Sequence, residues 1–192
     1  MRRHTFDVLI SSAGVLVAAL MFVAGILGLW AHSFTTNQVY EQLSAQKIFF
    51  PPAGSKAIEG DEYAALQQYA GQQLTTGAQA EAYANHFIAV HLTEVAGGKT
   101  YAEVSSAALA DPTNTALQGQ ANTLFKGETL RGLLLTTYAF STIGQIAYVA
   151  GILFIIGGVV MLLLSLLGFR HSSRVPDEAE VLAGHPKEAV KA

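Results

Sequence analysis

The stretch from Gly144 to Ser165 constrains the fold more than any other part of the chain. It lies within a run that has no charged side chain between Arg131 and Arg170. Small residues recur in it at every seventh position: Gly144, Gly151, Gly158 and Ser165. An uncharged run of this length predicts a membrane-spanning helix, and the spacing lets another helix backbone approach one side of it closely.

A matching partner is present near the N-terminus. Residues 8–31 form the only other long apolar run, and small residues recur there at the same spacing, at Ser11, Ala18 and Gly25. Gly14, Met21 and Gly28 occupy the interleaved positions. We therefore expect two antiparallel helices that pack in lipid along these residues, which we call the small-residue seam.

The composition agrees with a membrane protein. Of the 192 residues, 51% are hydrophobic and only 13% are charged, which is too few charges for an ordinary soluble domain. We expect an all-α fold, a two-span helical hairpin with an external helical domain between the spans. The segments are a cytoplasmic N-terminus (1–7), two spans (8–31 and 145–169), the domain (32–144) and a disordered cytoplasmic tail (170–192).

The basic residues next to the spans predict the orientation. Arg2 and Arg3 precede the first span, and Arg170 and Arg174 follow the second. Between the spans, nine acidic residues outnumber five basic ones. The positive-inside rule then places both termini in the cytoplasm and the loop between the spans outside. The first run has 24 residues, longer than the apolar core of a cleaved signal peptide, and indicates a retained anchor.

Local signals predict helices throughout the domain. Thr76 and Gln79 form a capping box that opens a helix over 77–96, and Thr100 with Glu103 forms a second box. A shorter helix is expected over 61–70, and Asp111 before Pro112 resembles an N-cap that starts another helix. No segment has the alternating pattern of a strand.

One helix carries the candidate polar site. His91 and Glu94 fall within the apolar arc of the 77–96 helix, so we expect a buried carboxylate that bonds to His91 or to Arg131. His86 lies about 140° from His91 on an α-helix, so the two histidines do not form a metal pair of the i, i+4 kind. A ligand-binding or catalytic role for His91 and Glu94 remains the alternative to a structural hydrogen bond.

The turn Phe49-Phe50-Pro51-Pro52 lies beyond the first span. It is either a chain reversal that places two phenyl rings beneath the domain, or an exposed aromatic pair that contacts a partner protein. The sequence leaves both interpretations open.

Several function classes find no support in the sequence. Neither span contains an ionisable side chain, which argues against transport by this chain alone. The formal net charge of −3 includes no basic block, so no nucleic acid is expected as a partner. Zero cysteines exclude disulfides and cysteine-ligated metals, and no catalytic or cofactor-binding motif occurs. We expect no cofactor and no metal.

Three strings carry a resemblance to a known family: AQKIFFPP (45–52), YAGQQLTTGAQAEAYANHFIAVHL (69–92) and GETLRGLLL (127–135). Set between two spans, they resemble a family of two-span bacterial membrane proteins that is often labelled as aromatic ring-opening dioxygenase subunits. Ring opening of the extradiol type implies iron held by two histidines and a carboxylate. His86, His91 and Glu94 supply these residue types, but one helix does not hold them in the required facial arrangement.

The favoured expectation is a non-catalytic interaction or accessory-subunit role in a membrane or envelope complex. The partners would be the lipid bilayer and another membrane protein or further copies of this chain. A sensor or binding module for a small ligand outside the cytoplasm is the second alternative. A metal-dependent enzyme that uses His91 and Glu94 is the third.

Overall fold

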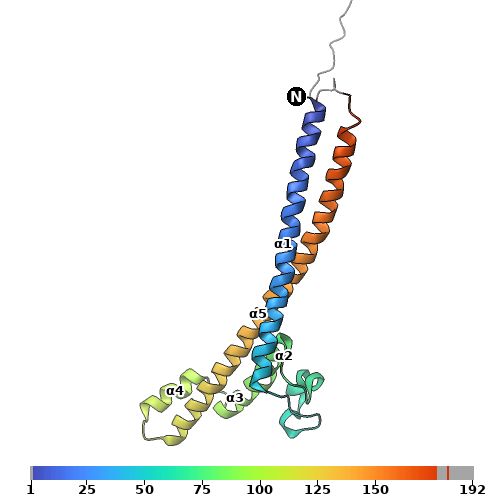
Figure 1. Ribbon diagram of the computed structural model, residues 1–192. Coiled ribbons are helices and arrows are strands. Elements are labelled where there is room, and N and C mark those ends of the chain that lie inside the picture. The colour runs from blue at the N-terminus through green and yellow to red at the C-terminus, as the bar shows by residue number, and fades with distance from the viewer. Residues whose placement is uncertain (1, 177–180, 182–192) are drawn as a thin grey trace, which may run out of the picture. The chain divides into compact units, whose positions relative to one another are not determined.

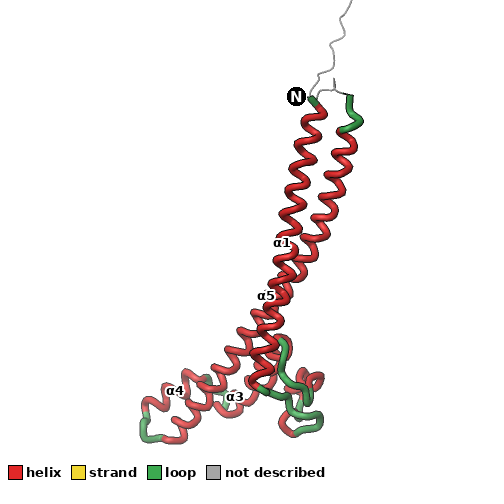
Figure 2. Tube along the Cα trace, in the orientation of Figure 1, coloured by secondary structure: helices red, strands yellow, loops and turns green. Residues whose placement is uncertain are grey.

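A computed structural model describes residues 2–176 and 181, and helices account for most of them (Figure 1). The α-helices are α1 (Arg3–Gln46), α2 (Gly77–Ala82), α3 (Ala89–Ala96), α4 (Tyr101–Ala110) and α5 (Thr115–Ser172). Two 3₁₀ helices, Lys56–Ile58 and Asp61–Tyr69, follow α1, and a π-helix, Tyr83–Ile88, joins α2 to α3. No strand occurs in the described part of the chain, apart from one isolated bridge between Phe49 and Gln73 (Figure 2). The expected all-α class is confirmed.

The chain divides into two compact units. One comprises Met1–Ala31 with Ala147–Ala192, and we call it the paired-helix unit. The other, His32–Ile146, is the helical domain. Helices α1 and α5 each contribute to both units, and each is long and apolar enough to cross a membrane.

Small residues bring α1 and α5 together in the paired-helix unit. A Cβ atom built on Gly28 would lie 2.8 Å from the carbonyl oxygen of Ala147, and one built on Gly25 would lie 2.9 Å from that of Gly151. Toward the other end of this unit, a Cβ on Gly14 would collide with Ser165. Residues with higher numbers in α1 contact residues with lower numbers in α5, so the two segments pack antiparallel.

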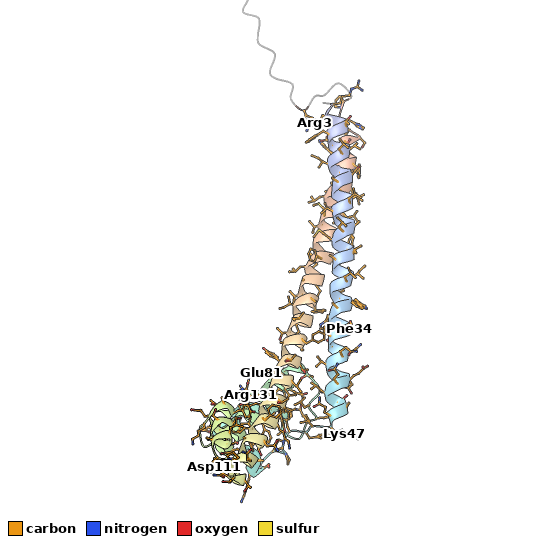
Figure 3. The ribbon with its side chains drawn as sticks, turned by 90° about the vertical axis from the view of Figure 1, so that its left-hand side faces the viewer. Arg3, Phe34, Lys47, Glu81, Asp111 and Arg131 are labelled. Carbon is orange, nitrogen blue, oxygen red and sulfur yellow. The ribbon has the colours of Figure 1, made fainter. Side chains whose placement is uncertain are left out.

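In the paired-helix unit the large apolar side chains face outward and small residues face the other helix, the reverse of the arrangement in a soluble protein. Ala18, in the seam, is only 1% exposed, whereas large apolar side chains point outward. Leu20 is 69% exposed, Leu16 67%, Leu153 63% and Leu167 61%. Side chains project from both helices along their length (Figure 3). Such a surface suits contact with lipid, because lipid tails are as apolar as leucine.

The helical domain has one hydrophobic core. Val39 and Leu43 near the end of α1, Leu66 and Leu74 in the connecting segments, and Leu124 in α5 are all buried in it. The chain reversal after α1 is fixed by two backbone hydrogen bonds, from the N–H of Phe50 to Gln72 and from that of Leu74 to Ile48, each 2.9 Å long. The reversal is therefore part of the core and not a loose connection.

The predicted 77–96 helix is present but is not a regular α-helix. Its buried residues include Ala80, Ala84, Ile88, Leu92 and Ala96, which follow one another at intervals of four. On an α-helix each such step rotates the position by about 40°, so Ala80 and Ala96 would face nearly opposite directions. The wider turn of the π-helix between α2 and α3 counters this drift and keeps the five residues on the core side.

Both predicted capping boxes are confirmed. The Thr76 hydroxyl accepts from the N–H of Gln79, and the Gln79 side chain accepts from the N–H of Thr76. Thr100 and Glu103 make the same pair of bonds at the start of α4. The bonds from the Thr100 N–H and hydroxyl lower the pKa of Glu103, because they stabilise its charged form.

The predicted start of the last helix of the domain was wrong. The last helix of the domain begins at Thr115 and is capped by Asn114, whose Oδ1 accepts from the N–H of Leu117. Asp111 instead ends α4 and bonds to the hydroxyl and N–H of Thr113. The short helix expected over 61–70 is present as the 3₁₀ helix Asp61–Tyr69. Of the expected tail 170–192, the first residues extend α5 to Ser172, while 177–180 and 182–192 lie outside the described residues.

Candidate functional site

The expected buried pair of His91 and Glu94 does not form. Glu94 is exposed, so its carboxylate stays in water and needs no partner. His91 donates from Nδ1 to the carbonyl oxygen of Phe87 at 2.9 Å. Its ring lies against the rings of Phe87 and Tyr63, with centroid distances of 4.4 and 6.0 Å. His91 therefore belongs to an aromatic cluster.

The phenols of this cluster are held in their neutral form. Burial raises the pKa of Tyr63, and the negative charges of Glu94 and Glu62 raise it further. Burial also raises the pKa of Tyr83, whose ring packs against Phe87 at a centroid distance of 4.8 Å. These groups stabilise the domain as uncharged aromatic side chains at neutral pH.

A metal site does not emerge from the histidines. His86 lies in the π-helix and is partly buried. Within residues 2–176 and 181, no group of three or more His, Asp or Glu side chains is arranged to hold a metal ion. The iron-ligand set implied by the ring-opening label therefore has no counterpart among these residues.

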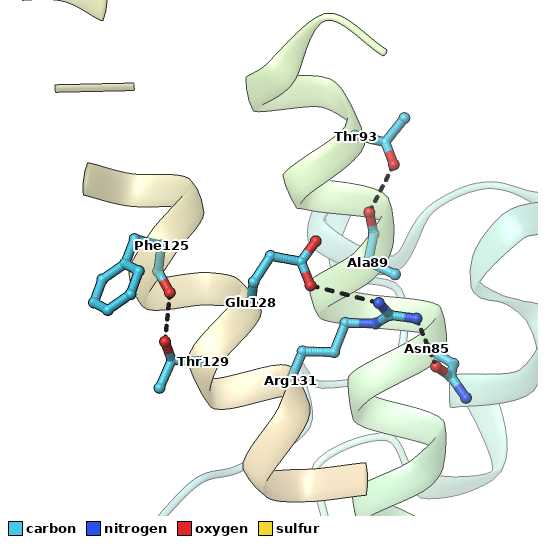
Figure 4. A network of polar contacts seen from close by, with 7 residues as sticks. All are labelled: Asn85, Ala89, Thr93, Phe125, Glu128, Thr129 and Arg131. Atoms are coloured by element: carbon cyan, nitrogen blue, oxygen red, sulfur yellow. Dashed lines mark hydrogen bonds and ion pairs between the residues drawn. The ribbon is translucent and has the colours of Figure 1, made fainter. Parts of the chain in front are cut away.

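The main polar network of the helical domain centres on Arg131 (Figure 4). Its Nη2 donates to Oδ1 of Asn85 at 3.2 Å, and its Nη1 contacts Oε2 of Glu128 at 3.5 Å. Asn85 in turn donates to Glu81 at 2.7 Å, and Glu81 and Arg131 lie in the same region of the domain (Figure 3). The network links the π-helix to α5.

One donor of this arginine is unused. The Nε atom of Arg131 is buried and has no hydrogen-bond partner among the described residues. Buried polar groups are nearly always bonded, so an unpartnered guanidinium donor indicates either a water molecule or a ligand.

A cavity of about 330 Å³ adjoins the network. Its walls come from α3, from the start of α4 and from α5, and its charged lining residues are Lys99, Glu128 and Arg131. Leu92 and Leu124 provide buried apolar wall. Its volume falls in the lower part of the range typical of small-molecule sites.

Sequence reasoning identified Arg131 but missed Lys99, Glu128 and Asn85. The i, i+3 spacing of Glu128 and Arg131 was the one available signal, since such neighbours on a helix can pair. Nothing in the sequence marks Lys99 or Asn85, because they meet Arg131 or its cavity only through the packing of the π-helix, α3 and α4 on α5.

The two phenylalanines proposed as a partner contact have different environments. Phe50 is 2% exposed and packs between the rings of Tyr69 and Tyr83, at centroid distances of 5.3 and 5.2 Å. It is therefore not available to a partner, and its inclusion in that contact was wrong. Phe49 is 56% exposed.

The predicted seam residues lie at different kinds of contact. Gly25 and Gly151 face each other's backbone, whereas a Cβ on Gly158 would meet the ring of Phe22 at 3.1 Å. Ser11, Ala18 and Ser165 are buried. Gly144 lies in the helical domain, where it packs against Thr35.

No protein-family model, curated protein or solved structure matches this chain.

Proposed function

We propose that the chain is a two-span protein of the bacterial inner membrane whose helical domain lies outside the cytoplasm and binds another protein of a membrane or envelope complex. The observation that carries this proposal is an exposed aromatic pair on the domain, with a further exposed leucine on α4. Tyr101 and Phe125 pack together, with ring centroids 5.8 Å apart, yet are 38% and 54% exposed. Leu109, also on α4, is 76% exposed. We call these three residues the α4–α5 apolar surface.

Exposed aromatic and aliphatic side chains of this kind are typical of binding surfaces, since they gain most when a partner removes them from water. The three residues are uncharged, and Glu103 is the only charged residue of α4. A non-catalytic role fits this surface. The apolar exterior of the paired-helix unit supports anchoring in lipid, and the arginines that flank the spans support cytoplasmic termini.

The topology predicts which positions a membrane-impermeant thiol reagent can reach. The chain has no cysteine of its own, so single substitutions give clean labelling. Ser106→Cys, at an exposed position of α4, should be labelled in intact spheroplasts. Ser173→Cys, exposed beyond α5, should be labelled only after the membrane is opened. The reverse pattern would overturn the orientation.

The interaction role predicts a companion that depends on the α4–α5 apolar surface. When the tagged full chain is extracted from its own membranes in mild detergent, we expect a stoichiometric partner to be retained. Leu109→Asp and Phe125→Asp should each remove it, because a buried unpaired carboxylate opposes association. Gln68→Glu adds charge at an exposed position away from this surface and should retain it. Equal recovery with all variants would contradict the proposal.

Binding of a small ligand is a second candidate function, and the cavity beside Arg131 favours it.

A further inference from the structure

The cavity between α3, the start of α4 and α5 carries an inference that does not require a protein partner, although Tyr101 belongs both to its lining and to the α4–α5 apolar surface. It lies wholly within the helical domain, and its lining includes charged groups of both signs. Lys99 and Arg131 provide two positive charges and Glu128 one negative charge. A ligand that satisfies all three must itself carry both signs.

The N-terminus of α4 contributes to the lining of the cavity. Lys99 and Tyr101 flank Thr100, the N-cap of α4, and all three line the cavity. The capping box occupies the N–H of Glu103, while the N–H groups of Tyr101 and Ala102 have no carbonyl one turn earlier in the helix. The carboxylate of Glu103 already bonds to the N–H and hydroxyl of Thr100 at this N-terminus, so the positive charge available to a ligand here is that of the Lys99 side chain.

Arg131 has donors to spare. Its contact with Glu128 is 3.5 Å long, whereas a charge-assisted hydrogen bond is about 2.7–2.9 Å. Its bond to Asn85 uses one N–H of Nη2, and Nε is buried without a partner. A small carboxylate placed beside the guanidinium would make a stronger bond than the present one to Glu128, and Asn85 would continue to orient the side chain.

Glu128 then becomes free to bind a cation. It is partly exposed, with 46% of its side chain accessible, and it lines the same cavity as Arg131. An ammonium group is the natural partner for a carboxylate at this position. Beyond the charges, Leu92 and Leu124 form an apolar wall.

We propose that this cavity binds a free α-amino acid with an apolar side chain. The ligand's carboxylate bonds to Arg131 and Lys99, its ammonium group bonds to Glu128, and its side chain packs against Leu92 and Leu124. A dicarboxylate would face repulsion from Glu128, and a simple amine would leave both cations unpaired.

Three matched probes test the assignment by calorimetric titration of the full chain in detergent or nanodiscs. L-leucine carries both charges, 4-methylpentanoate lacks the ammonium group, and L-leucinamide lacks the carboxylate. We expect L-leucine to bind most tightly, and loss of either charged group to weaken binding about tenfold, as expected for a hydrogen bond between charged groups. Inorganic phosphate, added as a fourth probe, should compete poorly because of Glu128.

Variants assign the two charged ends separately. Lys99→Gln should weaken the binding of both L-leucine and 4-methylpentanoate. Because Lys99 is exposed, this substitution should leave the core intact. Glu128→Gln should weaken the binding of L-leucine but not that of 4-methylpentanoate. The variant should then bind the two probes with similar affinity. Arg131→Gln should abolish binding of both, with circular dichroism used to verify folding because Arg131 also bonds to Asn85. Lys126→Gln, an exposed lysine of α5 outside the cavity, is the matched control.

Three results would overturn the assignment. The first is no heat of binding from any probe up to about 10 mM at two temperatures about 15 °C apart, since the heat-capacity change of binding keeps the enthalpy from being zero at both. The second is equal affinity for L-leucine in the wild type and in a folded Lys99→Gln or Glu128→Gln variant. The third is tighter binding of phosphate than of L-leucine, which would make the cavity a site for inorganic anions. None of these results would contradict the proposal of a protein partner, which the substitutions at Leu109 and Phe125 test.

Discussion

Phe50→Ala should lower the free energy of unfolding of the helical domain by about 3–5 kcal/mol, the usual effect of removing a buried phenyl ring. Phe50 is 2% exposed and lies against Tyr69 and Tyr83, so alanine would leave a cavity in the core. The substitution also removes an edge-to-face contact with Tyr83, whose ring plane lies at 83° to that of Phe50. Chemical denaturation of the detergent-solubilised full chain, followed by tyrosine fluorescence, measures the change.

The preceding residue is a matched control. Phe49 is 56% exposed, and its pairing with Gln73 is through the backbone, which alanine retains. Phe49→Ala should therefore change stability by less than about 0.5 kcal/mol, as is usual for a surface position. Similar losses from both variants would mean that the turn at 49–50 does not have the described orientation.

Gly151→Ala should separate α1 from α5 in the paired-helix unit. A Cβ at this position would lie 2.9 Å from the carbonyl oxygen of Gly25 and 3.1 Å from the backbone nitrogen of Leu29. Backbone atoms cannot rotate away as a side chain can, so the helices must move apart. We expect a loss of about 1–3 kcal/mol, the typical penalty for overpacking, and a larger loss with leucine. Disulfide yield between cysteines placed at Ser11 and Gly168, which contact each other across the seam, measures the separation within one chain.

Substitutions at two other glycines of α5 serve as comparisons for the loss of stability expected at Gly151. Gly158→Ala meets the ring of Phe22 at 3.1 Å, and this side chain can shift, so a smaller loss is expected. Gly132→Ala has nothing within 4 Å and should stabilise α5 by about 0.5–1 kcal/mol, because alanine is the better helix former. Crosslinks formed only between different chains, or equal effects at Gly151 and Gly132, would reject the intramolecular seam.

Hydropathy and short-range hydrogen bonding were predictable from the sequence. The two apolar helices follow from uncharged runs too long for most buried helices, and the caps at Thr76 and Thr100 depend on side chains only three residues apart. Competing local signals were harder to resolve. Asp111 and Asn114 are both good N-cap residues, and the helix begins at the second of them.

The candidate site was harder to predict, because it depends on tertiary packing. The interpretation of Glu94 assumed 100° per residue, and the π-helix that precedes it changes the direction of every later side chain. The apolar residues that recur at every fourth position from Ala80 to Ala96 were a usable sign of the wider turn of the π-helix. Lys99 and Arg131 are far apart in sequence and share a cavity only because α3 and α4 pack on α5.

The two ends of the helical domain are joined by a hydrogen bond from Nδ1 of His32 to the carbonyl oxygen of Gly144, 3.1 Å long and spanning 112 residues of sequence. Thr35 packs on Gly144 beside it. Bringing together the ends of a flexible chain of that length costs about 4 kcal/mol of conformational entropy at room temperature. Once the domain has folded, this cost is already met, and the two apolar segments that leave it need only align their small residues. The order of assembly therefore matters, because an intact domain makes the pairing of the two apolar segments effectively local. Damage to the core of the domain should weaken this pairing even when every residue of the two segments is unchanged.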